Sequence, residues 1–149
     1  MGKMKKKILT LLLIVISSIS ILGCSNTEVN EESGNDKGTY KIKHGELLEE
    51  NVNDDVLVIK AKIEPSMNNK LTISQNGFNI EDIIKNQGGD KFKEIQYWAV
   101  ADMSNGEESK VVSFTLNENL INNIKDGKIV ANQIIDNAQD VYILPSLQN

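Results

Sequence analysis

The chain has 149 residues, of which 40% are hydrophobic and 25% are charged, as expected for one globular domain and not for a multi-span membrane protein. Its 16 basic residues are all lysines and are outnumbered by 21 acidic residues, giving a net charge of −5. An acidic chain without arginine lacks the clustered basic surface and the guanidinium contacts that nucleic-acid binding uses, so no nucleic-acid partner is expected.

The N-terminus has the pattern of a secretory signal. Four lysines among the first seven residues precede an uncharged, largely apolar run over residues 8–22. This run is shorter than the roughly 20 residues that a helix needs to cross a bilayer. A basic start followed by a short apolar run is typical of a signal peptide, so residues 1–23 are excluded from the fold. An uncleaved membrane anchor is the alternative.

The end of the apolar run indicates how the chain is held. Residues 21–24 read Ile-Leu-Gly-Cys, which resembles the lipobox of bacterial lipoproteins. The resemblance implies that signal peptidase II cuts between Gly23 and Cys24 and that Cys24 carries a thioether-linked diacylglycerol. Leu22 stands where that family usually has alanine or serine. Cys24 is the only cysteine, so a disulfide within one molecule is impossible.

A lipid on Cys24 predicts a protein on the extracytoplasmic face of the cell membrane. Two acyl chains anchor a protein stably, whereas one binds only marginally. Removing residues 1–23 leaves 12 lysines against 21 acids, a net charge of −9. After Cys24, residues 25–38 contain one aliphatic side chain, so residues 24–38 are expected to form a flexible acidic tether that reaches about 20 Å.

Residues 39–149 are predicted to form a single domain that begins with strands. Apolar and polar residues alternate over residues 57–63, which predicts a strand with one wet face. Residues 46–50 can pair with it through a turn at residues 51–55. Residues 70–73 are a further short strand candidate. Asn79 then has the position of a helix N-cap, ahead of a helix that ends at Gly88-Gly89.

The clearest supersecondary signal is a hairpin of residues 94–103 with residues 108–116. Asn105-Gly106 between them is the preferred pair for a two-residue type I′ turn, because both residues need a positive φ. That turn would set the register of the two strands. The expected opposite pairs are Tyr97 with Phe114, Ala99 with Val112, and Met103 with Glu108.

This register places one aromatic residue on the face away from the core. Tyr97 and Phe114 lie on the core side, whereas Trp98 lies on the other side beside Val100 and Val111. An exposed aromatic residue with polar neighbours is a common binding platform, so these three residues are the candidate binding site. The alternative is a second core, in which a helix or the N-terminal hairpin covers Trp98.

The chain ends with a second short helix and two strands. Asn117 is its predicted N-cap and Gly127 its end, followed by strands over residues 128–131 and 140–144. The predicted fold class is α+β, a mostly antiparallel sheet with two short helices packed on one face. Residues 76–130, which include the run Ile-Gln-Tyr-Trp-Ala-Val-Ala-Asp, resemble uncharacterised small lipoproteins of low-GC Gram-positive bacteria. The resemblance implies an envelope location and transfers no catalytic residue.

Residues with the chemistry for catalysis are scarce. His44 is the only histidine, no G-x-S-x-G motif accompanies it, and the only cysteine is the one expected to carry the lipid. Zinc needs three or four ligands, which a chain with one histidine does not readily supply. Acidic and amide side chains around Asp54 could offer oxygen ligands to calcium, but their spacing differs from an EF-hand loop and also fits a solvated turn. No cofactor, metal site or catalytic residue is therefore predicted.

The function that these features favour is a non-catalytic binding or protein-interaction module, anchored to the membrane through Cys24. Its partner would be an envelope protein or a wall component. Two alternatives stay open at this point. One is a cell-envelope enzyme whose carboxylates come together only in three dimensions, and the other is an immunity or exclusion lipoprotein that acts on a membrane partner.

Overall fold

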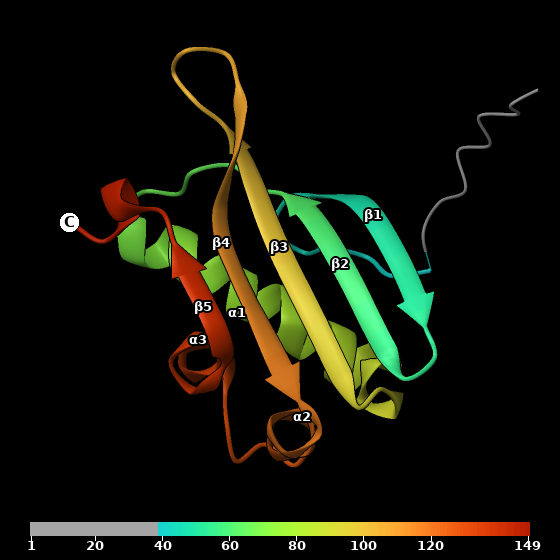
Figure 1. Cartoon of the computed structure of the whole chain (residues 1–149). Coiled ribbons are helices and arrows are strands. Elements are labelled where there is room, and N and C mark those ends of the chain that lie inside the picture. The colour runs from blue at the N-terminus through green and yellow to red at the C-terminus, as the bar shows by residue number, and fades with distance from the viewer. Residues whose placement is uncertain (1–38) are drawn as a thin grey trace, which may run out of the picture. The chain divides into compact units, whose positions relative to one another are not determined.

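Residues 39–149 are described by a computed structural model, in which helices cover one face of a five-stranded mixed sheet (Figure 1). The predicted signal peptide, Cys24 and the tether lie outside these residues. The strands are β1 (Glu46–Asn53), β2 (Val56–Lys62), β3 (Glu94–Asp102), β4 (Glu108–Asn117) and β5 (Gln139–Ile143). The helices are α1 (Asn69–Asn86), α2 (Glu118–Lys125) and α3 (Ile134–Asn137), with short 3-10 helices at Gly89–Lys91, Ala131–Gln133 and Pro145–Leu147.

The order of the strands in the sheet follows their order in the chain, and only one pair is parallel. β2 and β3 run parallel because α1 carries the chain from the end of one to the start of the other. The other neighbouring pairs are antiparallel. The predicted α+β class with a mostly antiparallel sheet is thus confirmed. The prediction of two short helices is wrong, because α1 has 18 residues and α3 is a third helix.

The first helix begins eleven residues before the sequence pattern suggests. Its N-cap is Asn68, whose side-chain oxygen accepts a hydrogen bond from the backbone N–H of Leu71 at 2.9 Å. Residues 70–73 are therefore helical and not a strand, and Asn79 lies inside the helix. The polar residues that hide the helical pattern, Asn76 and Asn79, are themselves fully buried.

These two asparagines belong to a hydrogen-bonded network in the core. The hydroxyl of Tyr97 on β3 donates to Asn76 Oδ1 at 3.1 Å and accepts from Asn79 Nδ2 at 3.0 Å. Asn79 also brackets the backbone of His44, accepting from its N–H at 2.8 Å and donating to its carbonyl at 3.0 Å. Burial raises the pKa of the Tyr97 hydroxyl above its ordinary value, so it stays protonated and able to donate. The network joins the sheet, α1 and the segment before β1.

Close backbone contact explains a glycine in the middle of α1. A Cβ atom on Gly77 would lie 2.1 Å from the carbonyl oxygen of Ala131, so only glycine lets the helix approach the 3-10 helix at Ala131–Gln133. The predicted strand over residues 128–131 is wrong, because these residues end α2 and then pack against α1. Lys128 and Ile129 donate their backbone N–H groups to Asn123 and so end α2, and Ala131 is buried under α1.

The β3–β4 hairpin keeps its predicted core pairs through two compensating irregularities. The turn has three residues and not two: the N–H of Gly106 donates to Met103, the N–H of Met103 donates to Glu107, and only Gly106 has a positive φ. Glu108 therefore lies opposite Asp102, and not opposite Met103 as predicted. A bulge at Val111 then restores the register, so that Tyr97 faces Phe114 and Ala99 faces Val112.

The first hairpin has a shorter turn than the sequence predicts, and the last strand lies where it is predicted. β1 extends to Asn53, so the turn before β2 is formed by Asp54 and Asp55 alone, with Asp54 at a φ of 52°. The predicted strand over residues 140–144 is present as β5. Within residues 39–149, no helix combines the length and the apolar character needed to cross a membrane.

Replacing Tyr97 with phenylalanine tests the buried network. Tyr97→Phe leaves an acceptor on Asn76 and one N–H of Asn79 with a lost partner in the core, which should lower the free energy of unfolding by about 1–3 kcal/mol. Tyr142→Phe is the matched control, because Tyr142 is 37% exposed, and its effect should stay within about 0.5 kcal/mol. Urea denaturation of both variants makes the comparison, and equal stabilities would contradict a structural role for the network.

Candidate functional site

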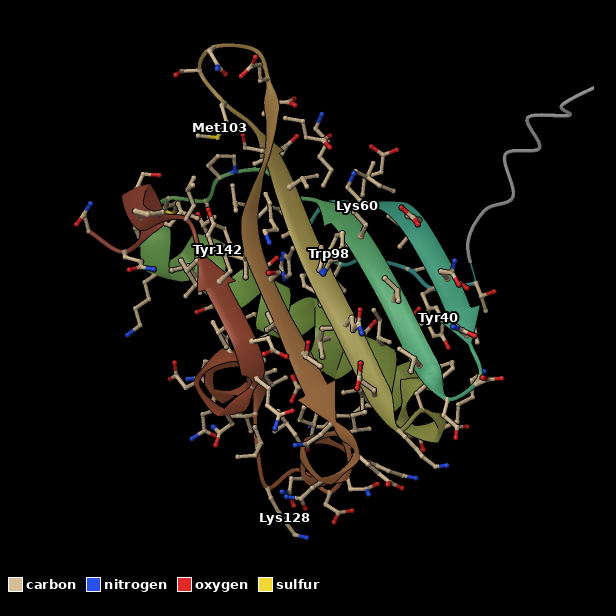
Figure 2. All side chains as sticks on the ribbon, in the orientation of Figure 1. Tyr40, Lys60, Trp98, Met103, Lys128 and Tyr142 are labelled. Atoms are coloured by element: carbon tan, nitrogen blue, oxygen red, sulfur yellow. The ribbon has the colours of Figure 1, made fainter. Side chains whose placement is uncertain are left out.

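The face of the sheet opposite the helices, here called the outer face, carries Trp98. Core residues of β3 alternate with outer-face residues, and the helices pack on the core side (Figure 1). Trp98 is 47% exposed, whereas Tyr97 and Ala99 beside it are fully buried. Among the described residues, nothing therefore forms a second core over Trp98. Figure 2 places its side chain near the middle of this face.

A single lateral row crosses the outer face at the level of Trp98. Lys60 on β2 lies opposite Trp98, Trp98 lies opposite Ser113 on β4, and Ser113 lies opposite Tyr142 on β5. Neighbouring strands are roughly 4.8 Å apart, so Trp98 and Tyr142 lie about 10 Å from each other at the backbone. Ser113 between them is only 6% exposed. The two exposed aromatic residues therefore flank a small covered position.

A lysine links the two rings. Lys110 places its Nζ 5.9 Å from the centroid of the Trp98 ring and 4.7 Å from that of the Tyr142 ring. Both distances are within the range of cation–π attraction. No carboxylate in residues 39–149 forms a salt bridge with Lys110, although Lys60 and Lys62 on the same face pair with Glu108 and Asp102. We call Trp98, Lys110 and Tyr142 the aromatic platform.

The two valines predicted to share the site do not offer surface to a partner. The bulge turns Val111 into the hydrophobic core, where it is 4% exposed. Val100 is on the outer face by its register but is 6% exposed. Tyr142 and Lys110 take their place. The alternation in residues 140–144 could have pointed to Tyr142, but its partner strand cannot be read from the sequence alone.

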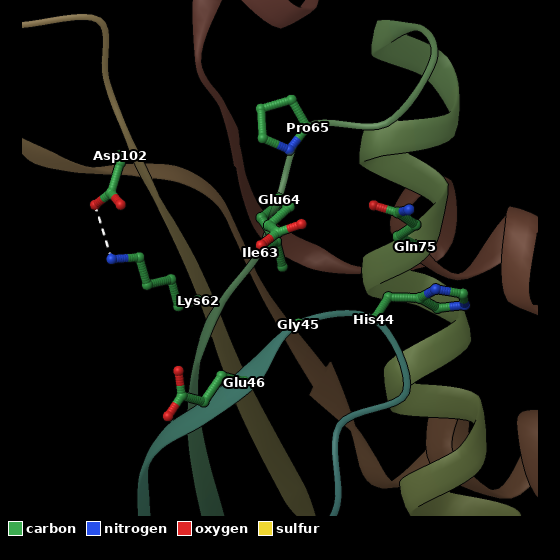
Figure 3. A pocket seen from close by; sticks show the side chains of 9 residues that line it. All are labelled: His44, Gly45, Glu46, Lys62, Ile63, Glu64, Pro65, Gln75 and Asp102. Atoms are coloured by element: carbon green, nitrogen blue, oxygen red, sulfur yellow. Dashed lines mark ion pairs between the residues drawn. The ribbon is translucent and has the colours of Figure 1, made fainter.

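A cleft at the end of the sheet is the second candidate. It has a volume of about 760 Å³ and lies where β2 and β3 end and β1 begins, against the side of α1 (Figure 3). Ligand sites in sheets with parallel strands commonly lie at the carboxyl ends of those strands. The polar side chains that line the cleft are His44, Glu46, Lys62, Glu64, Gln75 and Asp102.

One ion pair in the cleft is well formed. Lys62 Nζ lies 2.8 Å from Asp102 Oδ1, and this hydrogen bond raises the pKa of the Lys62 ammonium. Glu46 and Glu64 form no salt bridge with any described residue. The sequence pattern does not reveal this group of four charged residues, because they come from three separate segments. The crossover through α1 brings the ends of β2 and β3 together.

The acidic turn around Asp54 is organised by an ion pair. Asp55 receives a hydrogen bond from Lys93 Nζ at 2.6 Å, and its carbonyl accepts the backbone N–H groups of Lys93 and Glu94. The bond to Asp55 raises the pKa of the Lys93 ammonium. Across residues 39–149, no three His, Cys, Asp or Glu side chains are grouped so that they could hold a metal ion.

Comparisons with known proteins leave the site to be judged from its own chemistry. No protein-family model matches the chain, and neither the curated proteins nor the solved structures searched give a match.

The exposure of Trp98 can be tested against the burial of Phe114. Phe114 is 1% exposed and stacks on Tyr97 with ring centroids 5.1 Å apart, so Phe114→Ala should cost about 3–5 kcal/mol of stability. Trp98→Ala should cost about 1 kcal/mol or less. Thermal denaturation measures both variants. Since Trp98 is the only tryptophan, its fluorescence should respond to a soluble quencher, and a blue-shifted, unquenched emission would mean that the face is covered.

Proposed function

We propose that this protein is a lipid-anchored binding module on the extracytoplasmic face of the cell membrane. The proposed anchor rests on the sequence Ile-Leu-Gly-Cys at residues 21–24, at the end of a short apolar run. A diacylglycerol on Cys24 would hold the chain by two acyl chains, which is enough for stable attachment. The folded domain then needs no surface of its own for the membrane.

The aromatic platform is the observation that supports a binding role. Interface centres are rich in tryptophan and tyrosine, and polar residues surround them. Trp98 and Tyr142 lie in one row, and Gln96 and Thr115 on the same face supply a polar rim. Lys110 is held between the two rings, so the platform loses little side-chain freedom when a partner binds. The partner class is an envelope protein or a wall component.

Two other functions remain alternatives within this proposal. An envelope enzyme that uses carboxylates would place its chemistry in the cleft of Glu46, Glu64 and Asp102, although Asp102 is paired with Lys62 and its side chain is 63% exposed. An immunity or exclusion lipoprotein would use the same platform against an integral membrane protein. The identity of the bound partner separates this last function from wall binding.

The anchor makes a direct prediction. Cys24→Ala removes the only thiol that could carry the lipid, so incorporation of radiolabelled palmitate should disappear and the protein should no longer be retained as a lipidated membrane form. Cys24→Ser is the conservative control and should behave in the same way, because its hydroxyl cannot form the thioether. Palmitate labelling that persists in Cys24→Ala would refute the lipoprotein assignment.

The platform makes a separate prediction about the partner. A photo-crosslinking amino acid at Gln96, on the rim, should give one crosslinked product of defined mass in intact cells. The same group at Lys128, which is exposed three residues after the end of α2, should not give that product. Adding Trp98→Ala to the protein that carries the crosslinking group at position 96 should reduce the yield of the crosslinked product about tenfold or more, as expected when an aromatic anchor is removed. A product that is independent of Trp98, or equal from both positions, would refute the platform as the binding surface.

A further inference from the structure

The cleft at the carboxyl ends of β2 and β3 is built by backbone geometry before any ligand arrives. Gly45 has a φ of 114°, and a Cβ atom there would lie 2.1 Å from the carbonyl oxygen of Lys62. The chain before β1 can therefore run directly against the end of β2. Asn79 fixes the preceding residue, His44, through two hydrogen bonds to its backbone. One wall of the cleft is thus rigid, as pre-formed ligand sites usually are.

An apolar pocket adjoins this cleft. It has a volume of about 280 Å³ and shares Ile63, Pro65 and Asp102 with the cleft as lining residues. Its remaining walls are mostly apolar side chains, which come from the ends of β3 and β4 and from the C-terminal segment: Ala101, Met103, Val111, Leu144 and Leu147. The cleft alone has a volume within the ordinary range of ligand sites, about 300–1,000 Å³. Together the two cavities offer a polar compartment and an apolar one side by side.

The charges in the polar compartment select the ligand that enters it. Lys62 bonds to Asp102 and lies opposite Glu46 on the neighbouring strand, and Glu64 is a third carboxylate, so the lining of the cleft holds three carboxylates against one lysine (Figure 3). A concave surface with an excess of one charge concentrates ions of the opposite sign. The His44 side chain and the Gln75 amide on the α1 side add polar groups that can accept or donate hydrogen bonds.

We propose that this cleft binds a ligand that joins an ammonium or guanidinium group to an apolar group. The cation lies between Glu46 and Glu64, and the apolar group enters the pocket beside Met103 and Leu147. A lysine- or arginine-bearing peptide and a free aliphatic amine share this chemistry. The two cavities define the site and the excess of carboxylates in the cleft defines its preference, so the inference does not depend on the aromatic platform or on the lipid anchor.

Titration calorimetry with short peptides tests this inference. The full chain is held in nanodiscs of zwitterionic lipid, with empty nanodiscs as the blank. The blocked peptide Leu-Lys-Leu amide should bind with a Kd below about 1 mM, and raising the salt from about 0.05 M to about 0.5 M should weaken it, because exposed charges are screened. Leu-Glu-Leu amide and Ser-Lys-Ser amide should each bind at least about tenfold more weakly, since each lacks one of the two required groups. Hexylamine is compared with Leu-Lys-Leu amide to identify the source of the cation. Equal or tighter binding of hexylamine would indicate a free amine, and weaker binding would indicate a peptide.

Neutral isosteres of the two glutamates test the assignment of the cleft itself. The double variant Glu46→Gln with Glu64→Gln should weaken the binding of Leu-Lys-Leu amide about tenfold, the effect of two exposed charge contacts. Glu49→Gln is the matched control, because Glu49 is also an exposed β1 carboxylate opposite a lysine, Lys60, but does not line the cleft. Glu49→Gln and Trp98→Ala should leave this affinity within about twofold. No saturable binding, equal binding of Leu-Glu-Leu amide, or an unchanged affinity in the double variant would overturn the proposal.

Discussion

The hydroxyl of Tyr97 is the contact on which the arrangement of the domain depends. It joins β3 to α1 through Asn76 and Asn79, and Asn79 in turn holds the backbone of His44 ahead of β1. A buried polar group without a partner is costly, so these groups fit together in one relative position of sheet and helix. Apolar packing alone would tolerate a small slide of α1 along the sheet. The hydrogen bonds hold α1 in one position on the sheet, and they thereby also fix the wall of the cleft at the end of β2.

Local chemistry predicted much of the hairpin and little of the helix before it. The alternation of β3 and β4 assigned Tyr97 and Phe114 to the core and Trp98 to the outer face, because period-two patterns are decided by neighbours in the sequence. The three-residue turn and the bulge at Val111 shift the register in opposite directions, so the core pairs survived an incorrect turn. The sequence pattern predicts only the second part of α1, because Asn76, Gly77 and Asn79 have low helix propensity. These three residues are explained by tertiary contacts, which are the hydrogen bonds to Tyr97 and the close approach to Ala131.

The candidate sites also differ in how far local sequence patterns determine them. Trp98 could be predicted because its exposure follows from strand alternation. Lys110 and Tyr142 could not, since their contact depends on β5 pairing with β4 from the far end of the chain. The cleft could not be predicted from the sequence either. Glu46, Glu64 and Asp102 meet only because α1 makes β2 and β3 parallel, so that both strands end at the same end of the sheet. A purely antiparallel sheet would have put Glu64 and Asp102 at opposite edges.

The single crossover also explains why the outer face is open. One helical connection between parallel strands places its helix on one side of the sheet, and α2 and α3 join that same layer (Figure 1). The uncovered side must be compatible with water, and Gln96, Ser113 and Thr115 meet that condition on β3 and β4. Trp98 and Tyr142 do not, because an exposed aromatic ring gains little of the roughly 25 cal/mol per Å² that burial would give. Threonine or valine would serve the strand as well in their place. The binding role proposed above would use two aromatic side chains in one row around a lysine, which the strands themselves do not require.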